Sequence, residues 1–153
     1  MKLKVALLSL VCGTSCFASV EIMNEQMLVG TWSCSSSFFM GNLQVTELSE
    51  TTLNDNGTSI QKGITYYKAS DGEATLKYDV ASEWTMLGNK IKFSKLKINN
   101  YSISNHHFDQ TYQISSTLLS LGNKINSYTI LKFNNRELII KPDDYDLKET
   151  CQR

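Results

Sequence analysis

Two cysteines remain in this 153-residue chain once its N-terminal export signal is set aside, and they lie near opposite ends of the remainder. Cys34 follows two residues after Trp32, and Cys151 lies two residues before Arg153. A bond between them would join the first strand of the fold to its last segment. Such a bond is expected where a β-sheet curls until its first and last strands meet, so the pair predicts a closed architecture.

The start of the chain has the pattern of a secretory signal. Lys2 and Lys4 form a short basic start, an apolar run over residues 5–11 is broken only by Ser9, and small residues follow. We expect cleavage after Ala18, which makes residues 1–18 the signal peptide. The apolar run is too short for a membrane-spanning helix, which needs about 20 residues.

The alternative is a lipid anchor on Cys12 or Cys16. A lipid-attachment site calls for an aliphatic residue three places upstream, where these cysteines have Ser9 and Gly13. We therefore expect a bacterial protein that is exported in soluble form, to the periplasm or the medium, rather than an anchored one.

Residues 19–153 are expected to form one domain of 135 residues. Because Lys2 and Lys4 leave with the signal, 13 basic residues face 15 acidic ones, a net charge of −2. The sequence has no basic stripe for nucleic acid and no second long apolar stretch for a membrane span. In an exported chain, an even number of cysteines predicts a disulfide, here Cys34–Cys151, rather than a metal site.

Short alternating runs between turn residues predict a mainly β fold, an antiparallel meander. The strongest turn is Asn56-Gly57, which supplies the positive φ angles of a tight hairpin. On the strand that follows, Ile60, Ile64 and Tyr66 are the candidates for the inner face. The expected strands are 29–39, 43–53, 58–69, 73–87, 90–103, 127–133 and 137–141, with 146–152 as the last segment and one helical turn within 22–28.

One segment, residues 110–125, predicts a short amphipathic helix instead. Its apolar residues recur at steps of four, three and four, which places them on one helix face; they are Ile114, Leu118, Leu121 and Ile125. Asp109 is the expected N-cap, because its carboxylate can accept amide hydrogens of the first turn. The helix would lie against the sheet or close one end of a barrel.

The tripeptide Gly30-Thr31-Trp32 resembles the G-x-W motif that opens the first barrel strand in lipocalins. Trp84 before the Gly88-Asn89 turn, and the Cys151-Gln152-Arg153 ending, are similar to features of small exported bacterial proteins with a lipocalin-like barrel. The resemblance implies a lipocalin-like barrel or half-barrel in which the first tryptophan closes one end. A helix before the last strands departs from the lipocalin plan, which leaves the strand number and the closure open.

The same resemblance implies a binding protein. Its barrel would hold a small apolar ligand among inward aromatic side chains, for which the candidates are Trp32, Tyr66, Tyr78, Trp84 and Phe93. The alternative is a filled barrel whose rim or outer face binds or inhibits another exported protein, since several of these side chains are bulky. An apolar cavity would favour the carrier, and a packed core would favour the protein-binding module.

Other reactive residue types form no recognisable site in the sequence. His106 and His107 are adjacent, so on a strand they would face opposite sides and could not share a metal ion. The acidic residues Asp143, Asp144 and Asp146 lack the glycine and the distal glutamate of a calcium loop. No serine lies in a nucleophile elbow, and both cysteines are committed to the disulfide. We expect no enzyme, no cofactor and no metal.

The two cysteines also predict a contact at the chain ends. If Cys34 and Cys151 face each other across antiparallel strands, Trp32 and Arg153 are the next facing pair on the same side. We therefore expect the Arg153 guanidinium to lie over the indole ring, with Arg136 as the alternative partner.

Overall fold

The computed structural model describes residues 23–153, and the predicted signal peptide lies outside them. Within this range the chain is an antiparallel meander of eight strands with three short α-helices and one turn of 3-10 helix. The strands are β1 (Gly30–Met40), β2 (Leu43–Leu53), β3 (Thr58–Ala69), β4 (Gly72–Leu87), β5 (Lys90–Ile103), β6 (Asn126–Phe133), β7 (Glu137–Pro142) and β8 (Glu149–Gln152). The helices are α1 (Glu25–Leu28), α2 (His106–Tyr112), α3 (Ile114–Ser120) and the 3-10 turn η1 (Leu121–Asn123).

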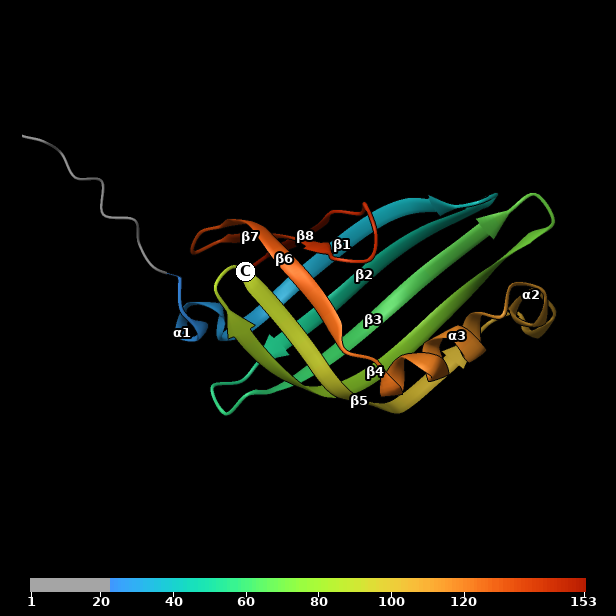
Figure 1. Ribbon diagram of the computed structural model, residues 1–153. Coiled ribbons are helices and arrows are strands. Elements are labelled where there is room, and N and C mark those ends of the chain that lie inside the picture. Colours follow the sequence, from blue (N-terminus) through green and yellow to red (C-terminus); the bar gives the residue numbers. More distant parts are fainter. Residues whose placement is uncertain (1–22) are drawn as a thin grey trace, which may run out of the picture.

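The strands follow one another around a closed ring, each hydrogen-bonded to the next and β8 to β1 (Figure 1). Cys34 of β1 lies opposite Cys151 of β8, and the two form a disulfide across a sequence separation of 117 residues. The predicted mainly β fold and the predicted disulfide are therefore confirmed. The strand ends differ from the expected ones by no more than one residue, except that β8 begins at Glu149 rather than at residue 146.

The inner face predicted for β3 is wrong, because the pairing register of the strand places the other set of side chains inside. Leu53 of β2 lies opposite Ser59, and both are buried. Ile60 and Tyr66 then point outward, with 44% and 45% of their surface exposed, and Ile64 shares their face. The Asn54–Gly57 turn fixes this register, so the apolar core of β2 decides which face of β3 is buried.

The predicted helix is divided into two. Gln113 adopts a left-handed conformation with φ of +55° and separates α2 from α3. Helical structure also begins earlier than expected, because the Asn105 side chain caps α2 by accepting a hydrogen bond from the Phe108 amide at 3.1 Å. Asp109 caps α3 instead, accepting from the Ser115 amide at 2.7 Å. No helix within residues 23–153 is long and apolar enough to cross a membrane.

The apolar face predicted for this segment is confirmed in part. Ile114 and Leu118 are buried and Leu121 is half-buried, whereas Ile125 follows the helices and is 68% exposed. The helices thus pack on the sheet through Ile114, Leu118 and Leu121 of the predicted apolar face.

One end of the ring, which we call the closed half, is filled by an apolar core. Its buried members are Leu28, Trp32, Cys34, Leu53, Trp84, Ile91, Ile130, Leu138, Ile140 and Cys151. The Arg153 guanidinium lies 4.2 Å from the centre of the Trp32 ring, which confirms the predicted contact. Arg153 also donates hydrogen bonds to the carbonyl oxygens of Met27 and Val29, both at 3.0 Å, so the last residue fastens the α1 segment over the core.

The other end, which we call the open half, has an incomplete wall. β1 pairs with β8 only through Ser33–Ser35, and β5 pairs with β6 only through Lys90–Phe93. Residues 36–40 of β1 and 94–103 of β5 therefore have a strand partner on one side only within the described chain. The helical segment borders the open half: η1 contacts β5 and α2 contacts β4 (Figure 1). A second apolar cluster lines the open half: Leu43, Val45, Ala74, Leu76, Phe108, Ile114 and Leu118.

Candidate functional site

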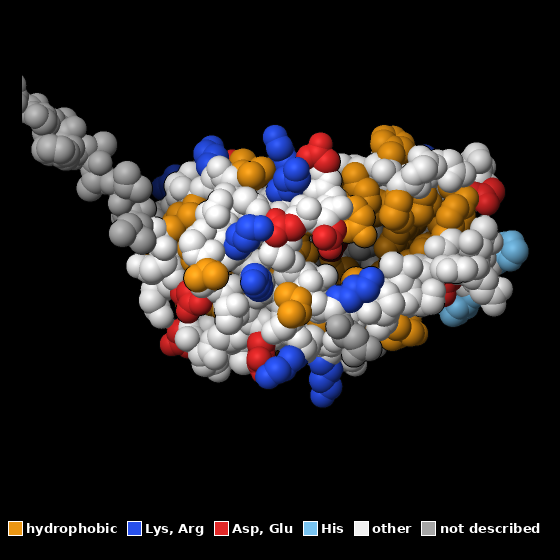
Figure 2. Space-filling view, viewed as in Figure 1, with side chains coloured by type: hydrophobic (Ala, Val, Ile, Leu, Met, Phe, Trp, Pro, Cys, Tyr) orange, Lys and Arg blue, Asp and Glu red, His pale blue; other side chains and the backbone are white. Residues whose placement is uncertain are grey.

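An apolar hollow enters the open half between its strands and the helices. Figure 2 shows hydrophobic side chains gathered in this hollow. Half-buried side chains pack against the buried cluster and continue it outward; among them are Phe38, Tyr67, Ala69, Ile98, Ile103 and Tyr112. Tyr112 holds α2 in place, because its hydroxyl donates to Asp71 Oδ1 at 2.7 Å. The open half thus presents a preformed apolar surface that solvent can reach.

A carboxyl group lies further inside, on the same face of β2 as the apolar lining. Glu47 follows Val45 by two residues and accepts a short hydrogen bond from the Tyr78 hydroxyl of β4. Gln61 Nε2 donates to the same hydroxyl at 3.2 Å. Gly63 of β3 lies beneath this contact, and a Cβ there would overlap the Tyr78 ring. The glycine therefore lets Tyr78 cross β3 and reach Glu47.

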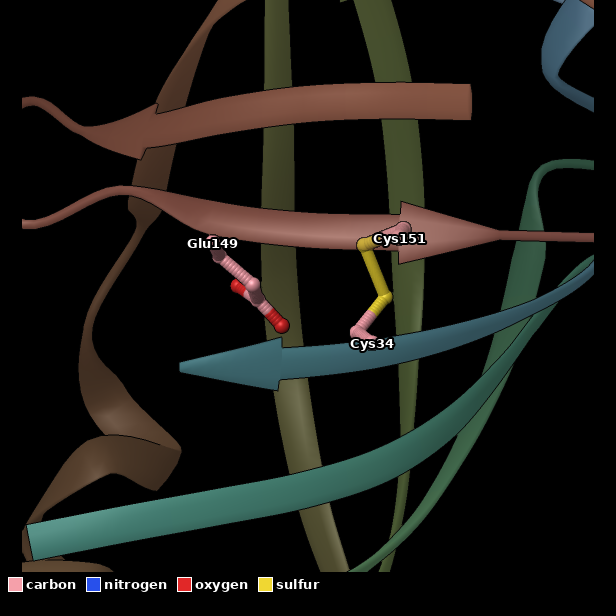
Figure 3. A group of neighbouring side chains, drawn as sticks. All are labelled: Cys34, Glu149 and Cys151. Atoms are coloured by element: carbon pink, nitrogen blue, oxygen red, sulfur yellow. A yellow bond between two sulfur atoms is a disulfide. The ribbon is translucent and has the colours of Figure 1, made fainter. Parts of the chain in front are cut away.

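A second carboxyl group enters from β8. Glu149 projects on the same face as the disulfide, with a carboxylate oxygen within 4.8 Å of both sulfurs (Figure 3). Ser35 pairs with Thr150, so one step further along the strands Glu149 reaches the level of Ser36. Ser36 pairs with Glu47 on its other side. Both carboxyl groups therefore lie at the level where β8 begins and the wall opens.

Burial dominates the electrostatics of this region. It raises the pKa of Glu47, although the hydrogen bond from Tyr78 opposes the rise. Burial, and then the charge of Glu47, raises the pKa of Glu149 to about 7. The pKa of Tyr67 rises to about 12 for the same two reasons, and the pKa values of Tyr78 and Tyr128 also rise. The three phenols therefore stay protonated. We call these five residues the interior carboxyl cluster.

The ligand-contact candidates from the sequence fall in three different places. Trp32 and Trp84 are buried in the core of the closed half, and Phe93 packs beside that core with its ring 5.7 Å from the Tyr128 ring. Tyr78 belongs to the interior carboxyl cluster. Tyr66 points to the outside, so its predicted place on the barrel interior is wrong. The structure does not bring the five aromatic side chains together.

Sequence reasoning missed the two glutamates as a pair. The alternation of Leu43, Val45 and Glu47 places an acidic residue on the inward face of β2, and Glu149 shares a face with Cys151. The available signal for each was therefore an acidic residue at a position where the strand alternation predicts an inward, apolar side chain. A glycine in the middle of a strand, Gly63, was the signal for a close approach.

Metal binding has little support from the described residues. Cys34, Cys151 and Glu149 form the one acidic, histidine or cysteine cluster of ligand-like spacing within residues 23–153, but its two sulfurs are bonded to each other. A disulfide sulfur is not a thiolate, which is the form that binds metals. Asp143 and Asp146 instead pair with lysines, at 2.7 Å and 2.9 Å.

A shallow groove crosses the outer surface of β1 to β5. It has a volume of about 790 Å³ and follows two rows of outward residues that lie opposite one another on paired strands. The rows are Ser33, Glu50, Lys62, Asp79 and Asn100, and Ser35, Leu48, Ile64, Lys77 and Ser102. Charged side chains of both signs lie along the first row, and Leu48 and Ile64 add apolar surface to the second.

The chain was compared with protein-family models and with curated proteins. No family model matches it, and no curated protein matches it either.

Proposed function

We propose that this is an exported, non-enzymatic binding protein of lipocalin-like architecture, which holds a small, largely apolar molecule in its open half. The observation that carries the proposal is the hollow of the open half, whose apolar lining leads inward to the interior carboxyl cluster. Most ligand sites of this kind are concave and apolar, with a few polar groups that orient the ligand. The Cys34–Cys151 disulfide indicates an oxidising compartment, which supports export.

The two halves of the barrel differ in what they leave free for a ligand. The closed half packs Trp32 and Trp84 to 1% and 3% exposure, so its core is filled. The open half instead keeps Phe38, Tyr67 and Ile98 half-buried at an incomplete wall. A ligand would complete the burial of these side chains, which is a favourable exchange for an apolar molecule.

A neutral fluorescent probe, N-phenyl-1-naphthylamine, tests the proposal. Its emission rises in apolar surroundings, and we expect saturable binding. Ala69→Trp adds bulk at the half-buried edge of the apolar cluster and should weaken binding by about tenfold or more. Ala81→Trp, on the outward face of β4, is the matched control and should bind as the parent does. Absence of saturable binding, or equal binding by both variants, would contradict the proposal.

The second candidate is a protein-binding or inhibitory module that uses the outer groove. The observation in its favour is the alternation of charge along one row of that groove, with Lys62 between Glu50 and Asp79. Native mass spectrometry of the protein purified from its source separates the two candidates. A co-purified small molecule supports the carrier, and a co-purified protein that is lost in the Lys62→Glu variant supports the module.

A further inference from the structure

We propose that the ligand of the open half is an amphiphile with a positively charged head, a protonated alkyl or aryl amine, whose ammonium group binds between Glu47 and Glu149. This inference rests on the proposed function and names the ligand class for the same site. The apolar body of the ligand would lie along the hollow, against the cluster that includes Val45 and Leu76.

The interior carries acidic groups without basic ones. Among residues 23–153 every lysine, arginine and histidine is exposed except Lys141, which is half-buried. Lys141 pairs with Asp146 at 2.9 Å and neighbours the inward Ile140, so it lies on the outer face. Glu47 and Glu149 therefore lie in one row on either side of Ser36, with no cation of the described chain inside the barrel to balance them. A buried carboxylate without a cation is costly, and an entering cation removes that cost.

The site also holds a buried hydroxyl that has no hydrogen-bond partner within the described residues, so it can receive a ligand group with several N–H donors. The Ser49 Oγ is buried, with the residue 8% exposed, and it has no hydrogen-bond partner within the described residues. Ser49 lies two residues from Glu47 on the same inward face of β2. Burial and the charge of Glu47, without a side-chain hydrogen bond, account for the raised pKa of Glu149. Buried polar groups are almost always paired in proteins, so the Ser49 hydroxyl calls for a ligand that supplies a partner.

An ammonium group matches this set of acceptors. It is a compact cation with three N–H donors, enough for the two carboxylates and a hydroxyl acceptor. The nearby phenol rings of Tyr67 and Tyr128 add faces that attract cations. A carboxylate or phosphate head would instead face like charges at the end of the hollow. The geometry thus discriminates between ligands by the sign of their head group.

The test compares three ligands with one alkyl chain by isothermal titration calorimetry at about pH 8: octylamine, octan-1-ol and octanoate. Octylamine is protonated there, since alkyl amines titrate near lysine, at about 10.4. We expect octylamine to bind at least about tenfold more tightly than octan-1-ol, and octanoate to bind most weakly.

Glutamine variants test which carboxyl groups cause the preference for the amine over the alcohol. Glu47→Gln and Glu149→Gln should each reduce the amine preference over the alcohol to about threefold or less, while the affinity for octan-1-ol stays within about twofold of the parent. Glu50→Gln, three residues from Glu47 on the outward face, is the control and should keep the full preference.

The outcomes separate this inference from the proposed function. Equal binding of octylamine and octan-1-ol would overturn the amine site and leave the carrier function standing. An amine preference that survives in both glutamine variants would place the cation elsewhere and also overturn the inference. If none of the three ligands binds at millimolar concentration, the inference and the carrier function both fail.

Discussion

The closed and the open half of this barrel share β1 to β5, but β6 to β8 complete the wall in the closed half only. The closed half joins β8 to β1 and covers Trp32 with Arg153, so its side chains are packed against each other. In the open half, residues 36–40 of β1 and 94–103 of β5 have one strand partner within the described chain, and η1 borders β5. The comparison shows that the disulfide lies at the border between the halves, with the filled core on one side of it and the accessible apolar surface on the other.

The largest effect is expected from removal of the disulfide between the two halves. The double variant Cys34→Ala/Cys151→Ala should lower the free energy of unfolding by about 4–5 kcal/mol, because the crosslink closes a very long loop. Urea denaturation of the oxidised parent and the variant measures the difference. A loss below about 1 kcal/mol would show that strand pairing alone keeps the ring closed.

A smaller effect is expected where the helices border the open half. Leu118→Asp places a charge among the buried side chains of the open half and should destabilise the protein by about 3–4 kcal/mol. Leu119→Asp is the matched control, since Leu119 is 52% exposed, and it should change stability by less than about 0.5 kcal/mol. Equal melting temperatures for the two variants would show that α3 is not docked as described.

The interior carboxyl cluster should make the stability of the protein depend on pH. The pKa of Glu149 lies at about 7 in the fold, above the ordinary value of 4.5. The stability that Glu149 contributes through this raised pKa is therefore fully present below about pH 4.5, and it is lost as the pH rises through about 7. Glu149→Gln should match the parent at about pH 4 and exceed its stability by up to about 3 kcal/mol at about pH 8.5.

Urea denaturation of Glu149→Gln and the parent across this range tests the sign. A variant that is less stable than the parent at about pH 8.5 would show that the ionised carboxylate stabilises the fold.

The smallest effect concerns the contact that covers the closed half. Arg153→Ala removes a cation over the Trp32 ring and should lower the free energy of unfolding by about 1 kcal/mol and alter tryptophan fluorescence. Lys148→Ala, an exposed charge on the same segment, should do neither. Unchanged emission in Arg153→Ala would mean that the guanidinium does not rest on the indole in solution.

The sequence predicted the closed half better than the open half. Cysteine count, the Asn-Gly turn and strand alternation depend on local rules, and they led to the strands, the disulfide and the Trp32–Arg153 pair. The face of β3 depends on its register with β2, which no local pattern in β3 reports, so Tyr66 was misplaced. Glu47 and Glu149 are 102 residues apart in the sequence, and only ring closure brings them to the same level of the barrel. No local pattern therefore predicts the interior carboxyl cluster.

Nuclear magnetic resonance tests most directly whether the open half, and not the closed one, receives the ligand. Titration of ¹⁵N-labelled protein with N-phenyl-1-naphthylamine should shift the amide signals of Val45, Glu47 and Leu76 through the ring currents of the probe. The amide signals near Trp32 and Trp84 should stay in place. Shifts confined to the closed half, or to the outer groove around Lys62, would contradict the account.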